Sequence, residues 1–155
     1  MPVDNLKILK ERMGVASDDE LTAFNDAVVD EFRTNHGQCG GRFEGNPMII
    51  ITMTGAKSGR QVTKPLTYCA DGDDCIIMAS AGGSPQNPAW FFNLEANPEI
   101  SVERGEETYS ALAVLTKGAE RQDAFDKMAA ALPRFGDYQA GVEREIPMFR
   151  LVRSS

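Results

Sequence analysis

The chain has 155 residues, 42% of them hydrophobic, which is enough to bury one substantial core and too little for two ordinary domains. Its 23 acidic and 16 basic residues give a formal net charge of −7, which argues against a nucleic-acid partner. Because no apolar run approaches the roughly 20 residues that cross a bilayer, and the N-terminus lacks a signal-peptide core, we expect a soluble, cytoplasmic protein.

Residues 1–16 are predicted to be an N-terminal segment, and residues 17–155 a single domain. In the N-terminal segment, Leu6, Leu9 and Met13 recur at helical spacing among basic residues. A mobile or capping terminus and an amphipathic, peripheral contact with a membrane surface both fit this pattern.

A long helix is predicted to begin after Ser17. Ser17 and Glu20 have the spacing of a capping box, and apolar residues follow at intervals of three and four, which predicts a helix ending near residues 35–37. His36, the single histidine, lies at that end. We therefore expect neither a histidine-based metal site nor a Ser-His-Asp triad, and no metal.

Three β-branched runs follow, at residues 48–53, 62–69 and 75–80, and short turns between them predict an antiparallel meander. Cys69 and Cys75 flank the last turn. A disulfide between these two is the alternative to three reduced thiols without metal-ligand spacing.

A short helix is predicted over residues 89–95, with Asn87 as its N-cap and Pro88 at its first position. Its apolar side chains include Trp90, which we expect to pack the helix onto the core.

The rest of the chain predicts further strands and one long helix. These elements are a hairpin over 99–103 and 107–115, a helix over 119–132 ended by Pro133, and a final strand over 146–152. The whole pattern predicts an α+β fold. In it, about six mainly antiparallel strands with flanking helices close into a small barrel, because closure removes exposed edges.

The turn between the first two predicted strands is unusually cationic. It carries Lys57 and Arg60, Lys64 follows in the next predicted strand, and no carboxylate occurs from residue 45 to residue 70. A glycine-bracketed turn with cations and hydroxyls suits an anionic, phosphate-bearing ligand. A solvated β-turn is the alternative, and the following β-like segment excludes a helix-forming P-loop.

Four motifs in order, at residues 41–47, 54–60, 79–83 and 87–98, resemble the deazaflavin-dependent nitroreductase and quinone reductase family of actinobacteria. The resemblance extends from about residue 28 to residue 153. It implies a split β-barrel of the FMN-binding type and an oxidoreductase that uses reduced coenzyme F420. The implied partner is a small-molecule acceptor, either a quinone or a nitro-aromatic compound.

The resemblance also implies roles for individual residues. The anionic arm of F420 would lie on the cationic turn, and the implied cofactor contacts are Lys57, Ser58, Arg60, Lys64, Pro65, Leu66, Ala79, Ser80 and Asn93. The acceptor wall would comprise Leu132, Phe135 and Tyr138. We expect Ser80 and Tyr138 to be the catalytic hydrogen-bond donors, with Phe135 stacking on the acceptor.

The chain departs from the family pattern at Ala56 and Ala81, where family members commonly carry polar or cationic residues. These two positions favour an alternative, a non-catalytic protein that binds F420 or a lipid-like ligand. A relative that has switched to FMN is a further alternative, because the fold is shared. A monomer and a homodimer are both compatible with the sequence.

Overall fold

The computed structural model describes residues 18–40, 45–81 and 86–154. Helix α2 (Asp18–Thr34) comes first and ends as the sequence predicts. The segment 1–16, the capping side chain of Ser17 and the motif residues at 41–44 and 82–83 lie outside the described residues. No helix in the described ranges is both long and apolar enough to cross a membrane.

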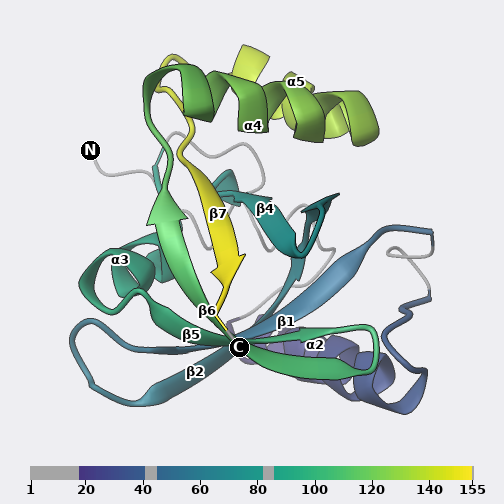
Figure 1. Cartoon of the computed structure of the whole chain (residues 1–155). Coiled ribbons are helices and arrows are strands. Elements are labelled where there is room, and N and C mark those ends of the chain that lie inside the picture. The colour runs from purple at the N-terminus through teal and green to yellow at the C-terminus, as the bar shows by residue number, and fades with distance from the viewer. Residues whose placement is uncertain (1–17, 41–44, 82–85, 155) are drawn as a thin grey trace.

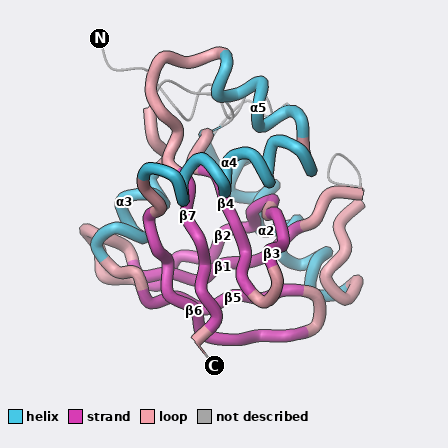
Figure 2. The backbone as a smooth tube through the Cα atoms, turned by 45° about the horizontal axis from the view of Figure 1, so that its top comes forward, coloured by secondary structure: helices cyan, strands magenta, loops and turns pink. Residues whose placement is uncertain are grey.

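The strands of the described residues form one antiparallel sheet (Figures 1 and 2). The strand order across the sheet is β2-β1-β5-β6-β7-β4-β3. Their bounds are β1 (Met48–Thr54), β2 (Gln61–Thr67), β3 (Cys69–Asp71), β4 (Asp74–Met78), β5 (Glu99–Arg104), β6 (Glu107–Leu115) and β7 (Met148–Arg153).

The sheet must curl, because its two outermost strands are consecutive in the chain. β2 and β3 lie at opposite ends of the strand order, yet Tyr68 is the only residue between them. A flat sheet of this width could not be spanned by one residue, since neighbouring strands lie about 4.8 Å apart. The α+β split barrel is thus confirmed. The predicted meander is wrong, because β2 pairs with β1 and the chain then crosses to the far edge.

The inner face of the curled sheet holds the main core. Ile49, Ile51 and Met53 of β1 point into it, and helix α3 (Ala89–Ala96) adds Phe91 and Leu94. Trp90 packs against the same core, with its ring 6.2 Å from that of Phe149, which confirms its expected packing role.

Helices cover two parts of the outer face. α2 packs through Phe32 onto Met48 and Ile50 of β1. Helices α4 (Gly118–Ala131) and α5 (Pro133–Ala140) lie together over β4 and β7, as Figure 1 shows. The sequence predicts Pro133 as the end of a helix. In the structure it also begins α5, because its fixed φ suits a first helical turn.

The disulfide alternative is wrong. In the β3–β4 hairpin, Cys69 is opposite Ile76 and Cys75 is opposite Ala70. Because these positions differ by one residue in register, the two sulfurs point to opposite faces of the sheet. Cys39, Cys69 and Cys75 are all free and buried.

Candidate cofactor site

The β1–β2 turn is a closed loop built by its own backbone. The Gly55 N–H donates to the Arg60 carbonyl at 2.8 Å, and the Gly59 N–H donates to the Gly55 carbonyl at 3.1 Å. The Arg60 N–H donates to Ser58 Oγ at 3.1 Å. Gly59 has φ of +69°, a conformation that favours glycine. The loop is therefore fixed in shape before any ligand arrives.

Helix α3 holds this turn from the side. The Ala56 N–H donates to Asn93 Oδ1 at 2.9 Å, and Asn97 Nδ2 donates to the Thr54 carbonyl at 3.3 Å. Asn93 and Asn97 are four residues apart and so share one face of the helix. Of these two residues, only Asn93 was predicted from the sequence as a cofactor contact. The Asn93 side-chain oxygen accepts a hydrogen bond from the turn. Asn93 therefore helps to fix the conformation of the turn.

Three cations on or beside the turn have no carboxylate partner in the part of the chain that the structure describes: Lys57, Arg60 and Lys64. Several cations elsewhere in the described chain are paired with carboxylates. Arg33 pairs with Glu103 at 2.8 Å, and Arg150 pairs with Asp71 at 2.6 Å. The contrast indicates that the three free cations are available to an anion.

We call Lys57, Ser58, Arg60 and Lys64 the cationic cradle. The backbone N–H groups of Lys57 and Ser58 also have no acceptor within the described residues, whereas those of Gly55, Ala56, Gly59 and Arg60 are used inside the protein. Two free amides, a hydroxyl and three cations form a donor set suited to phosphate or carboxylate oxygens.

The strand register sorts the β2 residues of the predicted site by face. Lys64 lies opposite Ile51 and Leu66 opposite Ile49, so both side chains are on the inner face with the main core. Pro65 lies opposite Ile50, whose side chain packs toward α2. The side chains of Pro65 and Leu66 therefore point to opposite faces of the strand, and a single ring cannot contact both side chains.

The second predicted cofactor segment, Ala79–Ser80, follows β4 and is buried. Arg144, on the loop before β7, donates to the carbonyls of Ala79 at 3.2 Å and Ser80 at 3.4 Å. The same guanidinium donates to Asn87 Oδ1 at 2.5 Å. Asn87 is thus engaged with Arg144, and Pro88 is the N-cap of α3, without a side-chain cap. The prediction of Asn87 as the cap is wrong.

The acceptor residues predicted from the sequence gather on and next to α5. Leu132, Phe135 and Tyr138 all belong to the apolar cluster beneath α4 and α5. The ring of Tyr138 meets that of Phe135 edge-on at 5.4 Å, and Phe135 is only 6% exposed. Ser80 comes from the end of β4 and Tyr138 from α5, so the two proposed donors lie on separate elements.

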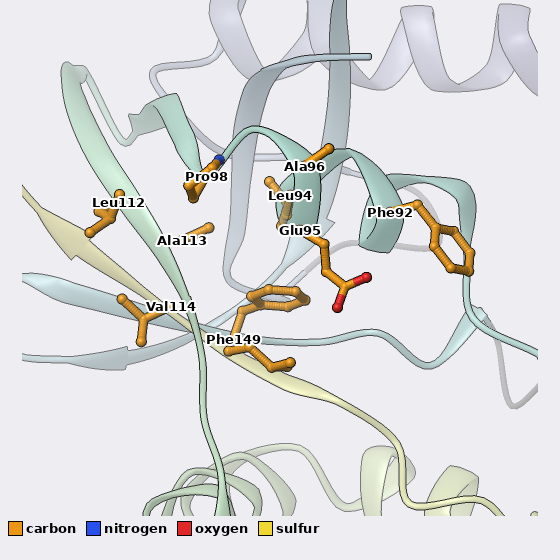
Figure 3. Close-up of a pocket in the computed structure, with 10 residues that line it drawn as sticks. Phe92, Leu94, Glu95, Ala96, Pro98, Leu112, Ala113, Val114 and Phe149 are labelled. Carbon is orange, nitrogen blue, oxygen red and sulfur yellow. The ribbon is translucent and has the colours of Figure 1, made fainter. Parts of the chain in front are cut away.

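A hollow of about 690 Å³ lies elsewhere, between α3 and β6 (Figure 3). Phe92, Leu112 and Val114 line it and are exposed. Its single charged lining residue is Glu95, which has the wrong sign for an anionic ligand. None of the predicted cofactor residues lines it, and its charge excludes it as the site of an anionic arm.

The inner core also contains a buried thiol and a buried phenol in contact with each other. Cys75 Sγ lies 3.5 Å from the Tyr109 hydroxyl, and the Arg104 guanidinium lies 3.9 Å from the sulfur. Burial raises the pKa of Cys75 and of Tyr109. Burial therefore favours the neutral forms of both groups.

The sequence analysis missed Asn97, Arg144 and Gln139 as residues that shape the site. Asn97 repeats the Asn93 side chain after four residues, a spacing that could have been noticed. Arg144 stands between Glu143 and Glu145 and resembles a solvated surface residue. Its carbonyl acceptors are remote in sequence, so no local signal reveals them.

Comparison with known proteins places this chain in a family. Residues 26–153 match the family model of the F420H(2)-dependent quinone reductases. An F420H(2)-dependent quinone reductase of Mycobacterium tuberculosis is 31% identical over 158 residues, which cover 97% of this chain and 99% of that protein.

Two solved structures show the same fold. One, an F420-H2-dependent reductase, is 35% identical with a TM-score of 0.64 over 68% of this chain and 93% of its own. The other, described as a domain-swapped dimer, is 31% identical with a TM-score of 0.66 over 87% of this chain and 99% of its own.

The residues present fit the cofactor that this family uses. F420 carries a phosphodiester and a glutamate tail, and the cradle offers free donors and unpaired cations to such oxygens. The chain therefore belongs to the F420H(2)-dependent quinone reductases, a family of oxidoreductases whose cofactor is coenzyme F420.

Proposed function

We propose that this protein transfers a hydride from reduced F420 to a planar, electron-poor acceptor, most naturally a quinone. The observation that carries the proposal is the cationic cradle, whose cations have no carboxylate partner in the described residues. When bound, reduced F420 supplies a hydride, that is, two electrons in one step. The protein then has to hold the anionic arm, exclude water and stabilise the acceptor oxygen as it gains charge.

The cofactor side of the site is assigned to the turn and to the strands beside it. Lys57, Ser58 and Arg60 bind the anionic arm, and Lys64 adds charge from the inner face of β2. Backbone and side chains of Pro65, Leu66, Ala79, Ser80 and Asn93 complete the contacts. The register supports contact with the ring through Leu66 and through the backbone of Pro65, because their side chains face opposite ways.

The acceptor side is assigned to α5. Tyr138 and Ser80 donate hydrogen bonds to the acceptor oxygen, while Phe135 and Leu132 supply apolar surface against the ring. Tyr138 is half-buried and packs on Phe135, which supports a phenol held in a fixed position. Tyr138→Phe should lower kcat with menadione and leave the affinity for F420 nearly unchanged. Equal losses of rate and affinity would remove this role from Tyr138.

The cradle is tested by the double variant Lys57→Ala/Arg60→Ala. Each lost charge-assisted contact is worth about 1.5 kcal/mol or more, so the Kd for F420, measured by fluorescence quenching, should rise at least about tenfold. The matched control is Arg33→Ala/Lys127→Ala, which removes two cations that pair with carboxylates elsewhere. Both variants change the net charge equally. Equal effects from the two would refute a local anion site.

The enzyme is separated from a carrier by single-turnover kinetics. Rapid mixing of the protein with reduced F420 and menadione should give oxidised F420 at a rate well above the uncatalysed one. Titration with FMN in place of F420 tests the alternative that this protein binds FMN as its cofactor. Tight binding of F420 without turnover would favour the carrier, and preferential binding of FMN would overturn the cofactor assignment. A parallel assay with a nitroimidazole decides whether nitro-aromatic compounds are also acceptors.

We further propose that the protein is a homodimer. The dimer described for the 31% identical solved structure supports this choice over a monomer. Light scattering coupled to size-exclusion chromatography measures the mass directly. A mass near 16.9 kDa at micromolar concentration would contradict the dimer. A peripheral membrane contact by residues 1–16 stays a prediction from the sequence, testable by vesicle sedimentation with and without that segment.

A further inference from the structure

Arg144 joins the Ala79–Ser80 segment, which we assigned to the cofactor side, to the residues that precede α3. Its Nη2 donates to the carbonyls of Ala79 and Ser80 at 3.2 and 3.4 Å, and to that of Gln86 at 3.1 Å. Its Nη1 donates to Asn87 Oδ1 at 2.5 Å. One guanidinium therefore binds the end of the β4 segment and the residues that lead into α3. A planar group with several fixed donors suits such a bridge, and a lysine does not.

The backbone around Arg144 is held in turn by α5. Gln139 Nε2 donates to the Arg144 carbonyl at 2.8 Å, and Gln139 Oε1 accepts from the Ile146 N–H at 2.8 Å. Arg121 of α4, which is 6% exposed, donates to Gln139 Oε1 at 2.8 Å and to the Ile146 carbonyl at 2.7 Å. Gln139 directly follows Tyr138. The loop that carries Arg144 is thereby fixed to the helix that carries the proposed acceptor residues.

The bridging contacts of Arg144 are therefore partly shielded from water. Desolvation by burial lowers the pKa of Arg144, which still remains charged at neutral pH. Hydrogen bonds from a charged donor to carbonyls are stronger than neutral ones, and the partial burial limits competition from solvent. The contacts of Arg144 and Gln139 form a continuous link from Ala79–Ser80 to α5.

We propose that Arg144 is a positioning residue that sets the placement of the Ala79–Ser80 segment relative to α5, and through it the placement of cofactor relative to acceptor. This inference rests on the proposed hydride transfer. A hydride step needs the reacting atoms near contact distance, and a displacement of about 1 Å can cost on the order of a hundredfold in rate. Arg144 touches neither reacting partner in this assignment. It acts through the backbone that carries Ser80.

The first test needs no cofactor. Hydrogen–deuterium exchange of the apo protein should be faster in Arg144→Gln at the Ala79 amide, which donates to the Pro147 carbonyl at 2.9 Å, by about tenfold or more. The amides of the β1–β2 turn should keep the wild-type rate. Arg150→Gln is the matched control, since it removes an arginine that binds Asp71 and Asp74 away from the site. It should leave exchange at Ala79 unchanged.

The second test uses reduced F420 and menadione. Arg144→Gln should lower kcat by about tenfold or more while the Kd for F420 changes less than about threefold, because the cradle is intact. Arg144→Lys should recover only part of the rate. Gln139→Glu keeps the acceptor for Arg121 and Ile146 but removes the donor to the Arg144 carbonyl, so it should also lower kcat.

The outcomes are distinguishable. Unchanged exchange at Ala79 together with unchanged kcat in Arg144→Gln would overturn the inference, as would an equal loss of kcat in Arg150→Gln. If Arg144→Gln does not fold, Arg144→Lys and Gln139→Glu are measured in its place. If the wild-type protein does not oxidise reduced F420, the proposed function fails. The exchange result alone then decides whether Arg144 holds the segment.

Discussion

At the scale of single residues, the site is defined by which charges lack partners. In this chain of net charge −7, several cations pair with carboxylates, among them Arg33, Arg150 and Arg153. Lys57 and Arg60 do not within the described residues. Carboxylates were already absent from this part of the sequence, and none of the ion pairs in the described ranges brings one to Lys57 or Arg60 from elsewhere. The positive potential at the turn is therefore left for a ligand.

Asn93 offers a sharper test of this electrostatic argument than removal of a cation does. Its Oδ1 accepts from the Ala56 N–H at 2.9 Å, and an aspartate could accept the same bond. Asn93→Asp should therefore preserve the turn but place a negative charge beside the cradle, raising the Kd for F420 about tenfold at low salt. Asn93→Ala should loosen the turn and weaken F420 binding. Its loss of affinity relative to the wild type should be the same at low and high salt.

The measurement is F420 fluorescence titration of both variants at 20 mM and 300 mM salt. Thermal unfolding is the control, since Asn93→Asp should retain a melting temperature closer to wild type than Asn93→Ala. If Asn93→Asp binds F420 as tightly as the wild type at low salt, the coenzyme's anionic arm does not lie on this turn.

The sequence could reveal Lys57, Ser58 and Arg60, because a turn places consecutive residues together. It could not reveal Arg144. The acceptors of Arg144 lie 57 to 65 residues away, and only the closed barrel brings the two segments together. Gln139 could not be identified from the sequence for a different reason. Its contacts with Arg144 and Ile146 are local, but they exist only because residues after Pro133 form a helix that the sequence analysis did not predict.

At the scale of elements, local sequence patterns predicted where the strands lie in the chain better than which strands pair with each other. The hairpin of β5 and β6 was found because a two-residue turn joins its strands. The predicted strand over 62–69 runs from β2 through Tyr68 into the first residue of β3, so the break between the two strands was missed. Whether the chain continues as one strand or bends into a new strand at this point depends on the curl of the whole sheet. That curl is set by contacts between residues far apart in the sequence.

The β3–β4 hairpin is fastened to its neighbours by charge. Asp71 of β3 accepts from Arg150 of β7 at 2.6 Å and from Lys127 of α4 at 3.2 Å. Hydrogen bonds from Arg150 and then from Lys127 lower the pKa of Asp71 below its usual value. The edge of the sheet therefore depends on an ionised carboxylate.

Because the pKa of Asp71 is lowered in the folded protein, its contribution to stability is complete above about pH 4 and is lost as the pH falls through the folded-state pKa. Asp71→Asn should lower the free energy of unfolding at pH 7 by about 1 kcal/mol, since these ion pairs are partly exposed. The difference between variant and wild type should shrink below pH 4. Urea titrations at pH 7 and pH 3 measure it. A difference that is the same at both pH values would contradict the role of the charge.

At the scale of the whole molecule, the curled sheet separates three apolar clusters. The inner core is closed by α3, while α2 and the α4–α5 pair cover different parts of the outer face. α3 is the element that joins structure to function. Its apolar side chains fill the barrel, and its asparagine face holds the cationic turn. The same helix thus packs into the core and holds the turn that we propose as the cofactor site.

The buried thiols report on the integrity of this arrangement, with one cysteine in each cluster. Cys39, Cys69 and Cys75 are 8%, 8% and 0% exposed, and burial raises the pKa of each thiol. Reaction with a thiol reagent requires an exposed thiolate, so each site must first open. Native protein at pH 8 should therefore react at least about a hundredfold more slowly than unfolded protein, with Cys75 the slowest.

Ellman's reagent with and without guanidinium chloride measures this difference, and mass spectrometry of the alkylated peptides assigns the sites. Unfolded protein that has never met a reductant should release three equivalents, because no two cysteines are bonded. A value near one equivalent would demonstrate a disulfide and contradict the register of the β3–β4 hairpin. Rapid reaction of Cys75 in the native protein would show that the inner core opens easily, a property incompatible with a barrel that α3 closes.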